Sequence, residues 1–148
     1  MGTYDIMEDP NIWAEIDLAA IDHNVRELRR ITHPRARMMA VVKADGYGHG
    51  AVEVAKTVLV AGADMLAVAR IDEAIELRQA GLDAPILVFS PTSPDLAANL
   101  IAHDLIQGVT GLAVAQQLDA VAQRYDTTIP IHLKVDSGMG RLGLLPDA

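Results

Sequence analysis

Short apolar runs that alternate with amphipathic stretches are the sequence feature that most constrains the fold of this chain. The runs have the length and aliphatic content of buried strands, and they occupy residues 38–43, 65–69, 86–89, 105–109 and 129–136. The stretches between them show helical spacing of apolar side chains, at residues 51–61, 72–80, 94–103 and 112–125. Apolar strands that alternate with helices predict a parallel sheet built from βα units.

The N-terminal part predicts one more strand and one more helix. Residues 12–18 alternate between apolar and polar side chains, as a half-buried strand does. The helix that follows carries an apolar face, and we expect Asp17 or Asp22 to cap its N-terminus.

The spacing of the strands limits the architecture to two choices. The predicted strand ends recur about every 20 to 27 residues, near residues 43, 69, 89, 109 and 136. This is the unit length of a (β/α)₈ barrel or of a doubly wound sheet. A closed barrel needs roughly 200 residues or more, and the chain has 148. The fold is therefore α/β, with about five parallel strands and no internal domain boundary. It is either an incomplete barrel of the TIM type or an open five-stranded sheet, and the periodicity does not separate the two.

The composition narrows the partners and the compartment. The formal net charge is −8, which disfavours nucleic acids and anionic membranes because the surface repels phosphate. There is no cysteine, so the chain has neither disulfides nor thiolate metal sites. Residues 1–11 lack the apolar segment of a signal peptide, and the most apolar segment, residues 58–69, is too short to span a bilayer. We expect a cytoplasmic protein.

The segment VVKADGYGHG, residues 41–50, places a lysine at the carboxyl end of a predicted strand. Ligands of α/β folds bind at this end of the sheet, and Lys43 shares a face of its strand with Val41. Partial burial there lowers the pKa of a lysine, and the neutral amine is the form that attacks a carbonyl to give a Schiff base. The alternative is a surface lysine whose ammonium reaches water.

Three glycines at alternate positions distinguish this lysine from an ordinary surface residue. Gly46, Gly48 and Gly50 do not form the G-x-G-x-x-G fingerprint of dinucleotide sites, but they allow positive φ and a close approach of the backbone to a ligand. The pattern predicts that Tyr47 and His49 are aimed from a turn. The Tyr47 hydroxyl would then donate to a phosphate oxygen; a packed tyrosine with a solvated tip is the alternative.

The fifth predicted strand has one apolar and one polar face. The polar face carries His132, Lys134 and Asp136, which would point into the interior of a barrel, where unpaired ions are costly and usually functional. An edge strand with a solvated face is the alternative. The glycine-rich loop that follows, residues 137–143, presents Arg141 as a planar donor for an oxyanion or a carboxylate.

No metal site is predicted, because His23, His33 and His103 lack ligand spacing. Ser90 has no G-x-S-x-G context and is not expected to be a nucleophile.

Two motifs carry a resemblance to a known family, KADGYGHG at residues 43–50 and KVDSGMGRLG at residues 134–143. Together with IWAEIDLAAIDHNVREL and APILVFSP, they resemble the alanine racemases, pyridoxal phosphate (PLP) enzymes that interconvert L- and D-alanine. The first motif is the more specific, and the likeness runs from about residue 11 to the end of the chain.

The resemblance implies a role for five residues. Lys43 would hold PLP as an internal aldimine and act as one of two acid/base catalysts at the substrate Cα. Tyr47 would contact the cofactor phosphate. Arg141 would bond the phenolic oxygen of the ring and help to bind the substrate, whose carboxylate would lie near Met139. Lys134 matches a position that is carbamylated in several members, and a carbamate there would be negatively charged and orient Arg141.

The resemblance also implies a larger assembly. Alanine racemases combine an eight-stranded barrel with a C-terminal β domain and work as homodimers that supply D-alanine for peptidoglycan. We therefore expect residues 1–148 to form the N-terminal, incomplete part of the PLP-binding barrel, without the β domain and with an exposed strand edge. None of Tyr4, Tyr47 and Tyr125 matches the catalytic tyrosine of the family, so the activity of this chain alone stays open.

Three other functions fit the same residues. A PLP carrier on a similar barrel would bind the cofactor without racemising alanine. A Schiff-base aldolase would use Lys43 on a sugar phosphate without PLP. A folded fragment that only associates with another polypeptide is the third. The pair of motifs GYGHG and GMGRLG favours the racemase.

Overall fold

The computed structural model describes residues 13–145, which contain a sheet of five parallel strands. The strands are β1 (Met39–Val41), β2 (Met65–Val68), β3 (Ile86–Val88), β4 (Ile106–Val109) and β5 (Ile131–Leu133). Their order along the sheet is β1-β2-β3-β4-β5, and each pair of neighbours is parallel.

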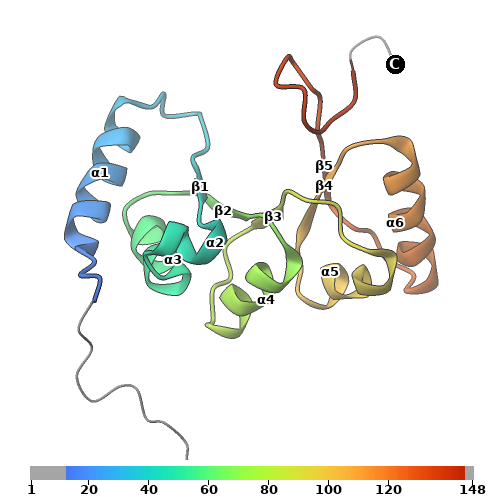
Figure 1. Cartoon of the computed structure of the whole chain (residues 1–148), viewed down its shortest axis with the longest axis horizontal. Helices are drawn as coiled ribbons and strands as arrows, with labels where there is room; N and C mark the ends of the chain where they lie inside the picture. The colour runs from blue at the N-terminus through green and yellow to red at the C-terminus, as the bar shows by residue number, and fades with distance from the viewer. Residues whose placement is uncertain (1–12, 146–148) are drawn as a thin grey trace, which may run out of the picture.

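The strand order decides between the two architectures that the sequence left open. A doubly wound sheet reverses its strand order at a switch point, because its helices cover both faces. Here every strand pairs with the next one in the chain, and the helices that connect the strands gather on one side of the sheet (Figure 1). This is the arrangement of an arc of a (β/α)₈ barrel. The prediction of an incomplete TIM-type barrel with five parallel strands is confirmed.

Helices precede and connect the strands of this arc. They are α1 (Leu18–Ile31), α2 (Lys43–Gly48), α3 (Ala51–Val60), α4 (Ile71–Gln79), the 3₁₀ turn η1 (Pro94–Leu96), α5 (Ala98–Ala102) and α6 (Leu112–Arg124). Among residues 13–145, no helix combines the length and the apolarity that a membrane crossing requires.

The N-terminal predictions are partly corrected. The predicted strand at residues 12–18 is wrong for its described part, residues 13–17, since no described segment pairs with it; residue 12 lies outside the described residues. Asp17 caps α1, because its carboxylate accepts hydrogen bonds from the N–H groups of the next turn at 2.9 and 3.0 Å. Asp22 instead pairs with Arg26 inside the helix, at 2.7 Å.

Three further elements are shorter than the sequence predicts. The strand predicted at residues 38–43 is ordered as β1 over three residues, because the chain enters the turn of α2 at Lys43. The helix predicted at residues 94–103 is divided into η1 and α5, because its first N–H groups bond three residues back, as in a 3₁₀ turn. The strand predicted at residues 129–136 is ordered as β5 over three residues, with one further bridge between Val135 and Leu144.

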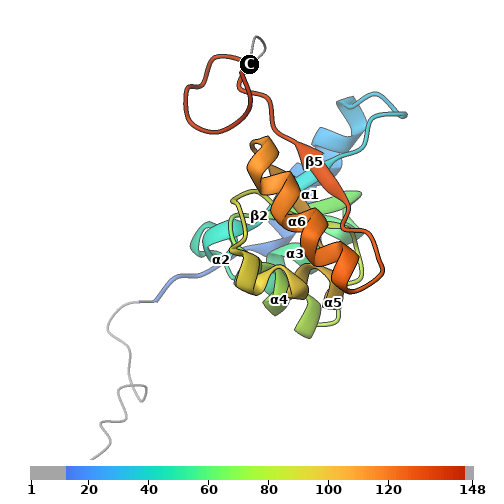
Figure 2. The same ribbon diagram turned by 90° about the vertical axis from the view of Figure 1, so that its right-hand side faces the viewer.

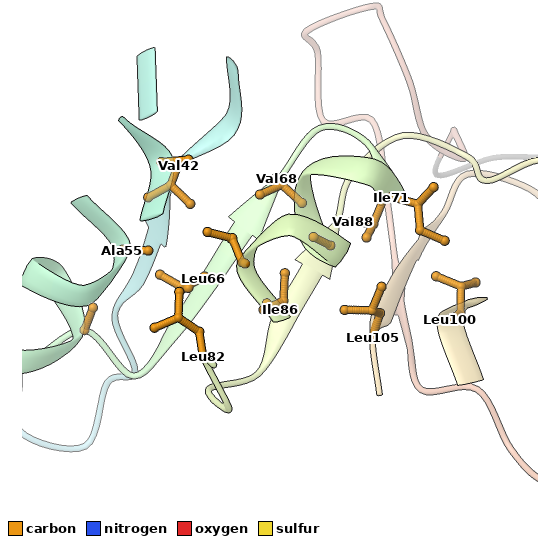
Figure 3. Close-up of a cluster of buried hydrophobic side chains, with 14 of the residues drawn as sticks. Val42, Ala55, Leu66, Val68, Ile71, Leu82, Ile86, Val88, Leu100 and Leu105 are labelled. Atoms are coloured by element: carbon orange, nitrogen blue, oxygen red, sulfur yellow. The ribbon is translucent and has the colours of Figure 1, made fainter. Parts of the chain in front are cut away.

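The main hydrophobic core lies between the sheet and the helices. Side chains alternate along a strand, so every second strand residue points into this layer. Figure 3 shows these strand residues meeting helix and loop residues, among them Val42, Ala55, Leu66, Val68, Ile71, Ile86, Val88 and Leu100. The inner face carries a smaller cluster of Met65, Ala67 and Leu87. Lys43, Ala69 and Phe89 continue these inner positions past the strand ends, which directs them to the inner side.

β5 is an edge strand of the described sheet. Ile131 and Leu133 are 47% and 59% exposed, so the apolar face of this strand is only partly covered. The sequence left two alternatives for this strand, an edge strand and a strand whose polar face points inside a barrel. Both hold in part, since β5 lies at an edge while His132 and Lys134 line the inner side of the arc.

The Arg78 side chain ties two loops together at the amino ends of the strands. Its guanidinium donates to the carbonyl oxygens of Leu82, Ala84, His103 and Asp104, at 2.6 to 3.0 Å. Burial lowers the pKa of Arg78 from its ordinary value. The loops before β3 and β4 are thus both attached to α4 through one side chain.

We expect Arg78→Lys to lower the free energy of unfolding by about 1–3 kcal/mol, because one ammonium cannot serve four carbonyl oxygens in two loops. Urea denaturation measures the change. Arg30→Lys is the matched control, since Arg30 pairs with Glu27 on the surface, and its effect should stay within about 0.5 kcal/mol. Equal effects of the two substitutions would contradict the bracing role of Arg78.

Candidate active site

A cavity of about 590 Å³ opens on the inner side of the arc, at the carboxyl ends of the strands. Its walls combine apolar and cationic side chains, from Lys43, Ala69, Leu87, Phe89, Ser90, Gly108, His132, Leu133, Lys134, Met139, Arg141 and Leu142. The end of each of the five strands contributes to this lining. The volume falls in the range of small-molecule sites, roughly 300–1,000 Å³.

Lys43 enters the cavity from the end of β1 and is half-buried. The chain then makes a turn of left-handed helix, because residues 44–47 all have φ between 50° and 60°. Residues four apart lie on the same side of such a turn, and the Lys43 Nζ atom is 5.7 Å from the centroid of the Tyr47 ring. The turn therefore places the aromatic ring against the amine.

The left-handed turn is costly for three of its residues. Ala44, Asp45 and Tyr47 are not glycine, and the left-handed conformation costs about 1–2 kcal/mol for each. The sequence predicted positive φ for Gly46, Gly48 and Gly50, which is confirmed, but not for these three.

Side chains of the turn itself hold it in this conformation. Asp45 Oδ1 accepts a hydrogen bond from the Ala51 N–H at 2.8 Å, which fixes the start of α3. His49 Nδ1 lies 3.1 and 3.0 Å from the carbonyl oxygens of Gly46 and Tyr47. Because carbonyl oxygens only accept, Nδ1 carries the proton and donates to them. His49 is therefore aimed back at the turn.

The loop after β5 brings three predicted residues to the same cavity. Lys134, Met139 and Arg141 all line it, and the loop stands away from the helical layer in both views (Figure 2). Met139 is 72% exposed. Gly143 closes the loop, since a Cβ atom there would lie 2.7 Å from the Asp136 nitrogen.

Asp136 organises the loop from within. Its Oδ1 atom accepts hydrogen bonds from the Gly138 and Gly140 N–H groups, at 3.0 and 3.1 Å. These two bonds, that of Gly138 first, lower the pKa of Asp136 from its ordinary value. The carboxylate thus binds the backbone of its own loop. The Lys134 and Arg141 side chains line the cavity instead.

The charge of the cavity is opposite to that of the chain. Lys43, Lys134 and Arg141 line it, and its described lining contains no Asp or Glu. None of these three cations has an ion-pair partner among residues 13–145. In a chain with 20 acidic and 12 basic residues, this concentration of positive charge suits an anionic ligand.

Gln107 was missed by the sequence reasoning, although a polar residue inside an apolar strand is a signal. It is fully buried on β4. Its Nε2 atom donates to the carbonyl oxygens of Ser90 and Gly108, both at 2.8 Å, and its Oε1 atom accepts from the Thr92 hydroxyl. This amide fixes the segment after β3 that supplies Phe89 and Ser90 to the cavity.

Gly108 allows the same segment to approach β4. A Cβ atom at Gly108 would lie 2.8 Å from the Phe89 carbonyl oxygen, a distance that real Cβ atoms do not adopt. The position of the cavity wall between β3 and β4 thus depends on the buried amide of Gln107 and on the absence of a side chain at Gly108.

The structure brings four of the five predicted site residues around one cavity, namely Lys43, Lys134, Met139 and Arg141. Tyr47 does not line the cavity and is 59% exposed, and it reaches the site only through its contact with Lys43. Phe89 and Ala69 were also missed, although each follows a strand end directly.

Comparison with known proteins gives one family for this arrangement. Residues 16–148 match the family model described as alanine racemase, N-terminal domain. The alanine racemase of Methanococcus maripaludis is 50% identical over 136 residues, which cover 92% of this chain and 36% of that protein.

Solved structures agree with this match. The alanine racemase of Clostridium difficile 630 aligns with a TM-score of 0.87 at 37% identity, covering 93% of this chain and 37% of that one. The alanine racemase of Streptomyces lavendulae, a producer of D-cycloserine, aligns with a TM-score of 0.85 at 40% identity, covering 95% and 37%. The chain thus spans 36% of the length of its M. maripaludis relative.

We expect Gln107→Leu to lower the free energy of unfolding by about 1–3 kcal/mol, because buried carbonyl oxygens lose their donor. Urea denaturation measures the change. The control is Gln123→Leu, which removes an exposed hydrogen bond to Asp119 and should change stability by less than about 0.5 kcal/mol. An equal effect at both positions would mean that the buried amide contributes nothing specific.

The loop after β5 should lose its order in acid. The folded-state pKa of Asp136 lies below the ordinary value of about 3.9, so its stabilisation is fully present above that value and is lost as the pH falls through the lowered pKa. The amide chemical shifts of Gly138 and Gly140 report this transition. Asp136→Asn keeps the Oδ1 acceptor without the titration, and an unchanged acid transition in this variant would rule out Asp136 as its source.

Proposed function

The chain belongs to the alanine racemase family through its N-terminal domain, and we propose that it forms the cofactor-anchoring part of a PLP-dependent alanine racemase. Since it spans 36% of the length of its M. maripaludis relative, the reaction, its substrate and its cofactor are inferred from the site. The observation that carries the proposal is the cavity around Lys43, with three cations and no carboxylate in its described lining.

The residues of the cavity fit the chemistry of PLP. The cofactor is a flat aromatic aldehyde with a phosphate and a phenolic oxygen, and it needs an amine, an apolar wall and cationic donors. Lys43 supplies the amine, Leu87 and Phe89 the apolar wall, and Arg141 a planar donor. A volume of about 590 Å³ accommodates such a ring together with a small amino acid.

PLP, when bound, supplies the electron sink that makes the Cα proton of alanine removable. The chain's own residues then have separate tasks. The Lys43 Nζ atom anchors the cofactor and afterwards takes or returns a proton at Cα. Arg141 donates to the phenolic oxygen and, with Met139 nearby, receives the carboxylate of the substrate.

Two other residues complete the proposed site. The Tyr47 hydroxyl donates to the cofactor phosphate, and the position of its ring beside Lys43 Nζ, at 5.7 Å from the centroid, supports this role. Lys134 would carry a carbamate that pairs with Arg141, which would reduce the repulsion between cations around one cavity. Neither role involves a metal.

We place the whole enzyme, as part of the same proposal, in the cytoplasm as a homodimer that supplies D-alanine for peptidoglycan. This follows from the family alone.

We expect PLP and borohydride to leave one stable adduct on the peptide that contains Lys43, and none in Lys43→Ala. Peptide mass spectrometry locates the adduct. The control is Lys56→Ala, because Lys56 pairs with Glu53 on the surface and has no part in the cavity; its adduct should equal that of the unsubstituted chain. An adduct that survives Lys43→Ala excludes Lys43 as the anchor.

The racemase reaction is measured separately, on the full-length protein, as D-alanine formed from L-alanine in the presence of PLP. An adduct on Lys43 without D-alanine would favour a PLP carrier over a racemase. Trapping of a sugar phosphate by borohydride without PLP would favour an aldolase.

A further inference from the structure

Glu73 connects the lysine strand to its neighbour through one carboxylate. Its Oε1 atom accepts a hydrogen bond from the Ala44 N–H at 2.7 Å. Its Oε2 atom accepts from the Ala69 and Arg70 N–H groups, at 2.8 and 3.0 Å. The side chain is half-buried, on the first turn of α4. Three backbone donors from the ends of β1 and β2 therefore converge on a single charged group.

An ordinary helix cap explains only part of this geometry. A glutamate at the third helical position commonly accepts from the N–H group before the helix, which accounts for the bond from Arg70. The bond from Ala44 is different, because Ala44 lies 29 residues earlier and on another βα unit. A capping role alone does not require that contact.

The Ala44 N–H group belongs to the peptide bond that joins Lys43 to the left-handed turn. Like the first N–H groups of any helix, it has no partner within the turn itself. Holding this peptide plane fixes ψ of Lys43 and the entry into a conformation that is unfavourable for Ala44, whose φ is 50°. The direction of the Lys43 side chain depends on both.

We propose that Glu73 is a positioning residue, which holds the Lys43 peptide against the end of β2 and so aims the amine into the cavity. The inference rests on the proposed role of Lys43 as cofactor anchor. The second oxygen of the same carboxylate fixes Ala69, which lines the cavity beside Lys43. One side chain thus sets the relative position of the amine and of the wall that it faces.

Only a carboxylate can make all three bonds. An amide of the same shape has one acceptor oxygen, and its NH₂ group would face a backbone donor. Glu73→Gln therefore keeps the size of the side chain but not all of its bonds. The single amide oxygen satisfies two donors when it faces Ala69 and Arg70 and one when it faces Ala44, so we expect the bond to Ala44 to be lost. Glu76→Gln is the matched control, since Glu76 lies on the same helix and is exposed; it loses the same charge without touching the turn.

The first measurement uses the chain without cofactor. Amide hydrogen exchange, followed by NMR, should show the Ala44 amide protected in the unsubstituted chain and exchanging about 10 to 100 times faster in Glu73→Gln, as expected for the loss of a hydrogen bond to a charged group. Amides in the middle of α4 and the Ala44 amide of Glu76→Gln should keep their rates. An unprotected Ala44 amide in the unsubstituted chain overturns the proposal whether or not the variant folds.

The second measurement follows the condensation of the Lys43 amine with the PLP aldehyde, which forms one C=N bond and releases one water. Its equilibrium constant should fall about tenfold or more in Glu73→Gln and stay unchanged in Glu76→Gln. Glu73→Asp keeps the charge but is one methylene shorter, and its equilibrium constant should fall as in Glu73→Gln. It replaces the glutamine variant in this measurement if that variant does not fold.

The two proposals fail in different ways. If the unsubstituted chain forms no adduct on Lys43, the proposed function fails, while the exchange rate of Ala44 still reports on the contact. If the adduct forms and Glu73→Gln matches the unsubstituted chain, the positioning role is wrong. Equal losses in Glu73→Gln and Glu76→Gln would assign the effect to charge and not to position.

Discussion

The parallel pairing of each strand with the next one in the chain is the constraint on which the rest of the structure depends. Because all five strands run in the same direction, their carboxyl ends meet along one rim. Because the order never reverses, the connecting helices bury the outer face of the sheet. The side chains on the inner face then point toward the cavity. Lys43 and Arg141, nearly a hundred residues apart in the chain, reach one cavity because β1 and β5 end at the same rim.

The backbone after β1 departs most from what its residues would adopt by themselves. A left-handed turn with three residues other than glycine is several kcal/mol less favourable than ordinary backbone. It persists because hydrogen bonds hold it at three places. Asp45 accepts from the first N–H group of α3, His49 donates to two carbonyl oxygens of the turn, and Glu73 accepts from the Ala44 N–H group. The same bonds give Lys43 a defined direction, so the unfavourable conformation and the proposed function are connected.

The positive charge of the cavity depends on nearby carboxylates that bind the backbone and do not pair with the cations. Asp136 is the acidic residue nearest in sequence to Lys134 and Arg141. Its carboxylate accepts hydrogen bonds from the backbone of its own loop and not from these two cations. Glu73 does the same with the backbone at the ends of β1 and β2. Acidic side chains that brace the backbone in this way leave cations to line the cavity, in a chain whose net charge is −8.

The sequence by itself determined the α/β class, the approximate positions of the five paired strands and the two glycine-rich segments, because these follow from local periodicity and from the conformational preferences of single residues. It left the helix cap open between Asp17 and Asp22, and the structure assigned it to Asp17. It did not decide between a barrel arc and an open sheet, since periodicity is the same in both. It also predicted a strand at residues 12–18 that, over 13–17, finds no partner among the described residues. Only the tertiary structure brought Glu73 to Ala44 and Gln107 to the segment after β3. Those contacts depend on which strands lie side by side, and no local pattern records that.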